Sequence, residues 1–221
     1  MVEDDPSLGY LMKDALEEDY QVKWLIDGQA ASEKFKEGDY DICLLDVMLP
    51  KKDGFSIAED IRGINQEVPI LFVSAKSMEE DRIKGFMKGG DDYITKPFSM
   101  DELKLRIDVF LRRSKTSPAK EESIRIGQYE FSHLNLTLTL NTDQRKLTRR
   151  ESELLHYLCK NHSQVIKRED ILNAIWGNDD YFNGRSLDVF ISKLRKYLAE
   201  DPGIKINNYH GVGFQFQVPE T

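Results

Sequence analysis

Asp41-Ile42-Cys43-Leu44-Leu45-Asp46 is a continuous apolar run that ends in a carboxylate, and it decides the fold of the first half of the chain. A second run, Pro69-Ile70-Leu71-Phe72-Val73-Ser74, ends in a hydroxyl. Unbroken runs of this length predict strands that are buried on both faces. Between the two runs, Ile57, Ile61 and Ile64 recur at helical spacing. Strands that alternate with helices predict a doubly wound α/β domain with a parallel sheet.

Charge is distributed unevenly along the 221 residues. The whole chain has 31 Lys and Arg against 39 Asp and Glu, a formal charge of −8, which by itself argues against a nucleic-acid partner. Residues 1–114 hold 16 basic and 25 acidic residues, whereas residues 115–221 hold 15 and 14. The segment between the halves is polar and contains Pro118, as linkers often do. We predict an acidic domain at 1–113, a linker at 114–123 and a nearly neutral domain at 124–221.

The composition also argues against several other classes of protein. No uncharged run approaches the roughly 18 residues that a membrane span needs. The acidic start, Met1-Val2-Glu3-Asp4-Asp5, does not resemble a secretory signal, so we expect a cytoplasmic protein with no membrane partner. Cys43 and Cys159 stand far apart and are expected to be reduced thiols, and the 4 histidines are too scattered for a zinc site.

Three capping boxes mark predicted helix starts. They are Ser77-x-x-Glu80, Ser99-x-x-Glu102 and Thr148-x-x-Glu151. In the second half, the last box precedes a helix containing 154–158, followed by helices around 171–176 and 185–198. Short alternating strands are expected within 124–140, and a hairpin with glycines near its turn at 204–218. Three helices and a terminal hairpin predict an α+β winged helix-turn-helix domain.

Reactive side chains follow the apolar runs of the first half. Glu3 and Asp4 come first, Asp46 second and Ser74 third, and a fourth short run delivers Lys96. Sites in open α/β sheets lie at the carboxyl ends of the strands. Three converging carboxylates would repel each other, so we expect Mg²⁺, which prefers oxygen ligands. A carboxylate held by Mg²⁺, a lysine and a hydroxyl can accept a phosphoryl group. For Asp46 alone the simpler reading is a loop cap, but the set together favours a site.

Four motifs, in order, give the chain a close resemblance to a known family. They are Val2-Glu3-Asp4-Asp5, Leu45 to Gly54, Phe72 to Lys76 and Gly90 to Phe98. The first half resembles the receiver domain of bacterial response regulators, and the second resembles the winged-helix effector of the OmpR/PhoB class. The resemblance covers essentially the whole chain. It implies a flavodoxin-like receiver with five parallel strands, followed by a DNA-binding domain.

The resemblance implies roles for the residues of the first half. Asp46 matches the phosphoacceptor, Lys96 the lysine that pairs with the phosphate, and Ser74 and Tyr93 the switch pair that moves inward. Without the motif, Tyr93 reads as a packing aromatic. The implied Mg²⁺ ligands are Glu3, Asp4, Asp46 and the carbonyl of Met48, with Asp4 the direct ligand and Glu3 acting through water.

The family's receivers dimerise when phosphorylated, which implies a dimer face here. The matching positions are Arg82, Asp91, Asp92, Glu102, Arg106 and Arg113. Pairs expected across the two-fold are Arg82 with Glu102 and Asp92 with Arg106. Exposed pairs are weak singly and set register more than affinity. For any one of these residues, a solvated charged surface is the alternative.

The third helix of the second half matches the family's recognition helix. From Arg185 to Lys196 it has four positive residues and one negative, and it is expected to enter the major groove. The implied DNA-contacting residues are Arg168, Trp176, Arg185, Ser186, Asp188, Val189, Phe190, Ser192, Lys193, Lys196 and His210. Phosphate contacts are expected from Arg168, Arg185, Lys193 and Lys196, base-edge contacts from Asp188, Val189, Phe190 and Ser192, and a backbone contact from Trp176. A solvated helix end is the alternative for Lys193 and Lys196. His210 stands in the wing where relatives often have Arg, so its contact should be weaker and pH-dependent.

These features predict a transcriptional regulator of a two-component system. A sensor histidine kinase would phosphorylate Asp46, and a homodimer would bind tandem promoter half-sites in double-stranded DNA, with RNA polymerase as a further partner. The protein would turn over no separate metabolite, catalysing only its own phosphorylation and dephosphorylation. One alternative is a regulator controlled by abundance rather than by phosphate. Another is a Mg²⁺-dependent aspartyl phosphohydrolase, whose second carboxylate is replaced here by Met48.

The first strand of the receiver is short in this sequence. Relatives precede the Val-Glu-Asp motif with about one strand's worth of apolar residues, whereas only Met1 and Val2 stand here. Loss of an interior strand would uncover its neighbours and leave Glu3 and Asp4 unanchored. We expect a trimmed chain rather than a damaged receiver.

Overall fold

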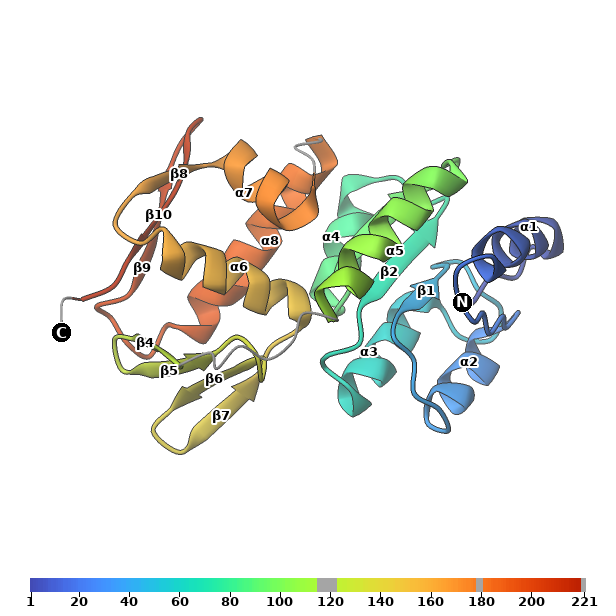
Figure 1. The fold of residues 1–221 in the computed structure, drawn as a ribbon, viewed down its shortest axis with the longest axis horizontal. Coiled ribbons are helices and arrows are strands. Elements are labelled where there is room, and N and C mark those ends of the chain that lie inside the picture. The colour runs from blue at the N-terminus through green and yellow to red at the C-terminus, as the bar shows by residue number, and fades with distance from the viewer. Residues whose placement is uncertain (115–122, 178–180, 220–221) are drawn as a thin grey trace. The chain divides into compact units, whose positions relative to one another are not determined.

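The computed structural model describes residues 1–114, 123–177 and 181–219, with the side chains of 112–114 and 181–185 left out. The chain divides into two compact units, Met1–Thr116 and Ser117–Thr221 (Figure 1). Most of the predicted linker, 114–123, lies outside the described residues. Among the helices described in the two units, none combines the length and the apolar character that a membrane span requires.

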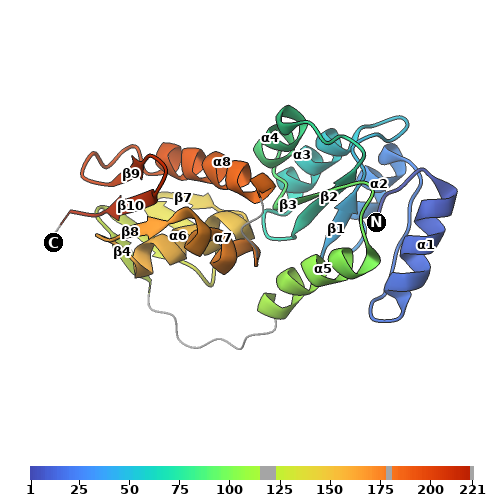
Figure 2. The same cartoon turned by 90° about the horizontal axis from the view of Figure 1, so that it is seen from above.

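The first unit is a parallel sheet covered by helices on both faces. Its elements are α1 (Pro6–Glu17), α2 (Gly28–Phe35), β1 (Cys43–Leu45), α3 (Gly54–Ile64), β2 (Ile70–Ser74), α4 (Glu79–Met87), β3 (Asp92–Thr95) and α5 (Met100–Ser114). The strands pair in the order β1-β2-β3, all parallel. Figure 2 shows α1 and α5 on one face of this sheet and α2, α3 and α4 on the other. The doubly wound α/β fold predicted from the apolar runs is confirmed.

One core of the first unit lies between the sheet and the pair α1 and α5. Its buried side chains are Met12, Leu16, Leu44, Leu71, Val73, Ile94, Leu103 and Ile107. The helical members recur at spacings of four residues, so they lie on one side of each helix. The strand members come from three neighbouring strands, and β2 is buried along its whole length.

The first two of the five expected strands are reduced to single bridges. Val2 bridges Leu25 on one side and Leu45 on the other, both in parallel. The order is therefore Leu25, Val2, β1, β2, β3, which is the flavodoxin-like order. The expectation that Glu3 would be unanchored is wrong, because its N–H donates to the carbonyl of Leu25 (3.0 Å) and its own carbonyl accepts the indole N–H of Trp24 (2.9 Å).

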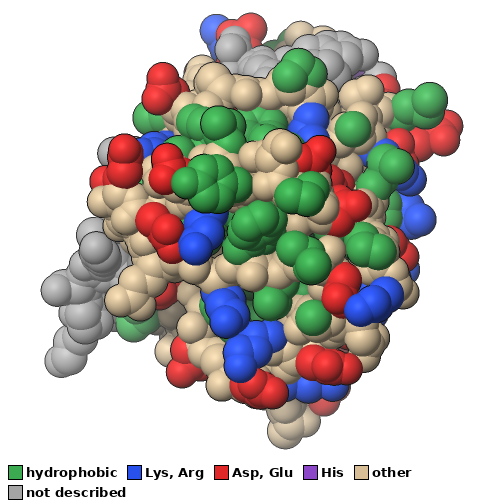
Figure 3. All heavy atoms as spheres, turned by 90° about the vertical axis from the view of Figure 1, so that its right-hand side faces the viewer, with side chains coloured by type: hydrophobic (Ala, Val, Ile, Leu, Met, Phe, Trp, Pro, Cys, Tyr) green, Lys and Arg blue, Asp and Glu red, His purple; other side chains and the backbone are tan. Residues whose placement is uncertain are grey.

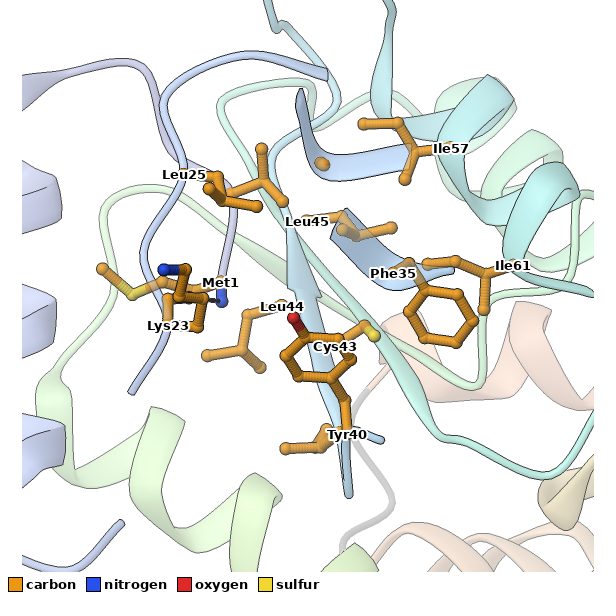
Figure 4. Close-up of a pocket in the computed structure, with 13 residues that line it drawn as sticks. Met1, Lys23, Leu25, Phe35, Tyr40, Cys43, Leu44, Leu45, Ile57 and Ile61 are labelled. Atoms are coloured by element: carbon orange, nitrogen blue, oxygen red, sulfur yellow. Dashed lines mark hydrogen bonds between the residues drawn. The ribbon is translucent and has the colours of Figure 1, made fainter. Parts of the chain in front are cut away.

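A small cavity of about 40 Å³ lies beside this bridge. Figure 4 shows its mostly apolar lining, with Met1, Leu25, Phe35, Tyr40 and Cys43 around it. The acidic residues of the predicted site do not line it. Burial raises the pKa of the Cys43 thiol to about 11, so the thiol stays protonated at neutral pH.

Two of the predicted capping boxes of the first unit differ from the structure. Helix α4 begins at Glu79 with Met78 as its N-cap and no side-chain hydrogen bond, so the box at Ser77 is wrong. At α5 the Ser99 hydroxyl accepts the N–H of Glu102 (3.1 Å). The Glu102 carboxylate accepts hydrogen bonds from Arg106 (2.9 and 3.2 Å). The ion pair competes with the cap for the same carboxylate.

The second unit is a winged helix-turn-helix with two antiparallel sheets. The strands β4 (Ile124–Ile126), β5 (Tyr129–Ser132), β6 (Thr137–Leu140) and β7 (Asp143–Lys146) form the first sheet. The helices α6 (Arg149–Lys160), α7 (Arg168–Trp176) and α8 (Tyr181–Tyr197) follow, with β8 (Val165–Lys167) between the first two. The hairpin of β9 (Lys205–Tyr209) and β10 (Gly213–Gln217) ends the unit, and β8 pairs with β10.

The helix boundaries of the second unit were predicted with mixed success. The capping box of Thr148 and Glu151 is confirmed in both directions. Helix α8 begins at Tyr181, four residues before the predicted start at Arg185. The strands β7 and β8 were missed, because Asp143–Lys146 is polar throughout and β8 has three residues. Such short strands are defined by their partners rather than by their own pattern.

A buried ion pair joins α3 to the start of β3. Arg62 donates to Asp91 (2.6 Å) and to the carbonyls of Val68 (2.7 Å) and Gly89 (2.9 Å). Asp91 also accepts the N–H of Ile70 (2.9 Å). The side chains are 8% and 0% exposed, so both charges depend on these partners.

We predict that Arg62→Leu destabilises the first unit by about 3–5 kcal/mol, because it leaves the Asp91 carboxylate buried without its cation. Urea unfolding followed by circular dichroism measures the change. The matched control is Glu17→Gln, which breaks the exposed i,i+4 pair with Lys13 (3.5 Å) and should cost less than about 0.5 kcal/mol. Equal changes in the free energy of unfolding for the two variants would contradict a stabilising role for the buried pair of Arg62 and Asp91.

Candidate functional site: an acidic pocket and a recognition surface

Glu3, Asp4 and Asp46 come together at one edge of the sheet. One carboxylate oxygen from each lies within 4.8 Å of the others. Glu3 and Asp46 are buried and Asp4 is exposed. Glu3 and Asp4 follow the bridge at Val2, and Asp46 follows β1 directly. An oxygen-only set of three carboxylates with one open side is chemistry that fits Mg²⁺, which keeps several of its waters.

Lys96 lies between two of these carboxylates. Its ammonium donates to Glu3 (2.7 and 3.0 Å) and to Asp46 (2.5 Å). Burial by itself would lower the pKa of Lys96, but the hydrogen bonds to Asp46 and Glu3 outweigh it and the pKa is raised. Burial raises the pKa of Glu3, and the hydrogen bond from Lys96 opposes that change. The lysine therefore stays charged and partly neutralises the acidic cluster.

The two oxygens of Asp46 have different partners. Oδ1 accepts the Ser74 hydroxyl (2.9 Å) and the N–H of Met48 (2.9 Å), and Oδ2 accepts from Lys96. The side chain of Met48 is 58% exposed beside them. This arrangement orients the carboxylate and leaves a nucleophilic oxygen near a positive charge.

Tyr93 lies inside the fold. Its ring is 1% exposed and its hydroxyl donates to the carbonyl of Lys76 (2.8 Å). Burial raises its pKa to about 12, so the phenol keeps its proton. The guanidinium of Arg82 lies 5.6 Å from the ring centroid. A residue of α4 thus contacts the aromatic that follows Asp92 on β3.

The predicted dimer residues fall into several environments. Arg106 pairs with Asp92 (3.0 Å) and with Glu102 (2.9 Å) within one chain. Asp91 is wholly buried against Arg62, so the prediction that it lies on a dimer surface is wrong. The pairing of Arg82 with Glu102 stays a prediction, and the side chain of Arg113 lies outside the described residues.

Four of the predicted DNA-contacting residues belong to the core of the second unit. Trp176 is 4% exposed, Ser186 1%, Val189 8% and Phe190 0%. The rings of Trp176 and Phe190 lie 5.8 Å apart, and Arg150 lies 5.0 Å from the Trp176 ring. The prediction that Val189 and Phe190 meet base edges is therefore wrong. Both continue the seam of Leu187, Ile191 and Leu194, which packs α8 inward.

Other predicted residues remain on the surface of the second unit. Ser192, Lys196 and His210 are exposed, and Asp188 is partly exposed. Arg168 forms a paired contact with Asp188 (2.8 and 2.9 Å). Lys193 pairs with the buried Glu151 (3.1 Å) and is 12% exposed, which takes it away from a phosphate-binding role. The side chain of Arg185 lies outside the described residues.

The sequence predictions missed several groups, on side chains and on the backbone, that support these surfaces. Trp24 contacts the backbone of the acidic cluster, and Lys76 supplies the carbonyl that holds Tyr93. Arg195, on α8, donates to the carbonyl of Ile206 (2.9 Å) and so ties α8 to the hairpin. No local pattern predicts these contacts, because each of them joins two different segments of the chain. The partners are 21 residues apart for Trp24, 17 for Lys76 and 11 for Arg195.

Comparison with known proteins agrees with this architecture. Residues 1–108 match the family described as response regulator receiver domain, and residues 142–216 match the one described as transcriptional regulatory protein, C terminal. The transcriptional regulatory protein RprY of Bacteroides fragilis is 45% identical over 222 residues, which span 100% of this chain and 94% of that protein. The transcriptional regulatory protein TrcR of Mycobacterium tuberculosis is 36% identical over 225 residues, which span 100% and 86%.

A crystal structure of the response regulator DrrB of Thermotoga maritima, described as an OmpR/PhoB homolog, is also similar. It shares 29% identity and a TM-score of 0.51, covering 98% of this chain and 96% of that one. The chain belongs to the OmpR/PhoB family of two-component response regulators, with a receiver domain followed by a DNA-binding transcription-regulator domain.

We predict that Mg²⁺ changes the fluorescence of Trp24, because its indole N–H bonds to the carbonyl of Glu3 next to the acidic cluster. Titration of the full chain with MgCl₂ should give a saturable change that Asp4→Asn weakens. The control is Trp24→Phe, which leaves Trp176 as the only tryptophan. A similar change in the Trp24→Phe protein, or none in the wild type, would contradict a cation site at these carboxylates.

Proposed function

We propose that the protein is a phosphorylation-controlled transcriptional regulator whose phosphoacceptor is Asp46. The observation that carries the proposal is the convergence of Glu3, Asp4, Ser74 and Lys96 on this one aspartate. A phosphoryl donor would transfer its group to the Asp46 carboxylate and form an acyl phosphate. Membership in the response-regulator family supports a sensor histidine kinase as the donor.

The surrounding groups would stabilise charge during the transfer. Lys96 offers an ammonium to the phosphoryl oxygens, and Ser74 and the N–H of Met48 offer hydrogen bonds. Glu3, Asp4 and Asp46, with the carbonyl of Met48, would hold Mg²⁺, which when bound neutralises the developing negative charge. These four groups would position the cation, and none of them would exchange a proton.

The switch would run from Asp46 through Ser74 to Tyr93. The Ser74 hydroxyl already contacts Asp46, and Tyr93 is held by the carbonyl of Lys76, two residues after Ser74. A phosphoryl group on Asp46 would compete with the carboxylate for the Ser74 hydroxyl. It would thereby favour one position of the loop from Ser74 to Lys76. Arg82 and Asp92 adjoin Tyr93, which supports coupling to a dimer face on α4, β3 and α5.

Dimerisation would place two winged helices on tandem half-sites about one helical turn apart. The second half of the chain carries 15 basic and 14 acidic residues, so its attraction to DNA must come from local charge. Lys196 lies exposed on α8, and the wing presents His210. These features support binding of α8 in a DNA groove, and they indicate that a monomer is only weakly attracted to DNA.

The kinase would dock beside the acidic cluster. Helix α1 follows Glu3 and Asp4 and exposes Tyr10 (65%) and Leu11 (56%), and Met48 is exposed as well. Figure 3 shows the side of the molecule on which α1 and α2 lie in Figure 1, and hydrophobic side chains gather there among charges of both signs. Exposed apolar groups next to a reactive carboxylate favour a protein donor over a small molecule.

A regulator that binds DNA without phosphate is a second candidate. One observation favours it: the Ser74 hydroxyl contacts Asp46 and the Tyr93 ring is buried, which is the inward arrangement that phosphorylation would favour. In this case the protein's abundance would set promoter occupancy. Binding by an Asp46→Asn variant with wild-type affinity, under phosphorylating conditions, would favour this candidate.

We expect Asp46→Asn to abolish labelling by radioactive acetyl phosphate or by a phosphorylated histidine kinase, because the amide cannot form the acyl phosphate. The measurement is the base-labile label that the wild-type protein retains. Asp41→Asn, an exposed neighbour outside the cluster, is the control and should label normally. Undiminished labelling of the Asp46→Asn protein would place the phosphoacceptor elsewhere.

We expect Lys196→Ala to weaken DNA binding about equally for all sequences and to reduce the slope of log affinity against log salt by about 1. Fluorescence anisotropy at several salt concentrations gives both quantities. Lys160→Ala removes an exposed lysine at the end of α6 and serves as the control. An unchanged salt slope in Lys196→Ala would remove this residue from the DNA surface.

A further inference from the structure

A paired contact joins the two helices of the helix-turn-helix at the surface. Arg168, the first residue of α7, donates from Nη1 to Oδ1 of Asp188 (2.8 Å) and from Nη2 to Oδ2 (2.9 Å). The two side chains are 30% and 44% exposed. Two parallel bonds from a planar guanidinium fix both the distance and the orientation of the carboxylate.

Arg168 is held from other directions too. Its guanidinium carbon lies 5.2 Å from the centroid of the Phe214 ring on β10. Its backbone N–H donates to the carbonyl of Val212 in the wing (3.1 Å). The guanidinium is thus in contact with α8 and with β10, and the backbone of the same residue is tied to the wing. The partner of Asp188 therefore has contacts of its own that favour this position of its guanidinium.

Asp188 lies on the outward side of α8. With Ser192 and Lys196 it forms a column at spacings of four residues, while Leu187, Phe190 and Ile191 are buried on the other side. Asp188 is the eighth of the 17 residues of α8, so it lies in the N-terminal half of the helix, ahead of Ser192 and Lys196. The N-terminal part of a recognition helix is the part that contacts base edges.

The pair changes what the carboxylate can do near DNA. An unpaired carboxylate on this surface would be repelled by the phosphates, whereas the pair with Arg168 has no net charge. A carboxylate has about four lone-pair sites, of which Arg168 occupies two. Two sites remain to accept hydrogen bonds from a donor in the groove.

We propose that Asp188 is a specificity-determining residue that accepts a hydrogen bond from the amino group of a cytosine, with Arg168 as its positioning residue. The proposal rests on the proposed function, in which α8 enters the major groove. In that groove cytosine presents an amino donor, guanine and thymine present acceptors, and adenine presents an acceptor beside its amino group. A fixed carboxylate is repelled by each of those acceptors, so cytosine is favoured.

The test is selection of bound sequences from a random duplex DNA library by the full-length chain treated with acetyl phosphate and Mg²⁺. The wild type should favour cytosine about 10- to 100-fold at one position in each half-site. Asp188→Ala should lose the preference at that position alone, and Asp188→Asn should move it toward adenine. Glu130→Gln, which changes an exposed carboxylate on β5 of the same unit, is the control and should select the wild-type sequence.

A double-mutant cycle separates positioning by Arg168 from phosphate binding. If Arg168 acts through Asp188, Arg168→Ala reduces the cytosine preference in the wild type and has no further effect in the Asp188→Ala protein. Arg168→Lys, which keeps the charge but loses the second hydrogen bond, should restore part of the preference. The slope of affinity against salt should not change with either Arg168 variant in the Asp188→Ala background.

Two results would overturn the inference while leaving the proposed function in place. One is an unchanged cytosine preference in Asp188→Ala. The other is equal weakening by Arg168→Ala in both backgrounds with a salt slope reduced by about 1, which would make Arg168 a phosphate contact. If the wild type selects no sequence at all, the proposed function fails and the inference fails with it.

Discussion

The ammonium of Lys96 between the carboxylates of Glu3 and Asp46 is the interaction on which the receiver unit depends. Three carboxylates with oxygens within 4.8 Å repel each other, and the positive charge of Lys96 offsets part of this repulsion. Each partner arrives from the end of a different strand or bridge, so the attraction also holds these ends together. The raised pKa of Lys96 shows that its partners outweigh the effect of burial. The same charge that offsets the repulsion at rest is available for a phosphoryl group.

Buried charges are also paired with opposite charges in the second unit. This pairing reduces the number of basic side chains that are available to bind DNA. Glu151 is 2% exposed and accepts hydrogen bonds from the N–H of Thr148 (3.0 Å), from Lys193 (3.1 Å) and from the Tyr197 hydroxyl (3.1 Å). The start of α6 is thereby tied to the last turns of α8. Lys193 is drawn inward by this carboxylate, because burying Glu151 without a cation would be far more costly than losing one exposed lysine.

Much of the fold could be predicted from the sequence because its signals are local. The apolar runs before Asp46 and Ser74 predict strands β1 and β2, and the box of Thr148 and Glu151 predicts the start of α6. Two of the local cap signals failed. Ser77 does not cap α4, and the Glu102 carboxylate, predicted to close a box with Ser99, pairs with Arg106. Strand β8 exists because β10 lies beside it, and nothing in its three residues announces that partner.

The sequence by itself determined which groups stand at the ends of the receiver's strands, and hence the kind of chemistry to expect there. Strand periodicity and the rule for α/β sheets bring such groups to one edge whatever the details of packing. Only the tertiary structure decided which polar residues are available. It buries Asp91 against Arg62, turns Val189 and Phe190 into the core, and joins Arg168 to Asp188. These outcomes depend on which helix face is covered and on which charge lies nearest in space. The spacing of residues along the chain does not specify either of these.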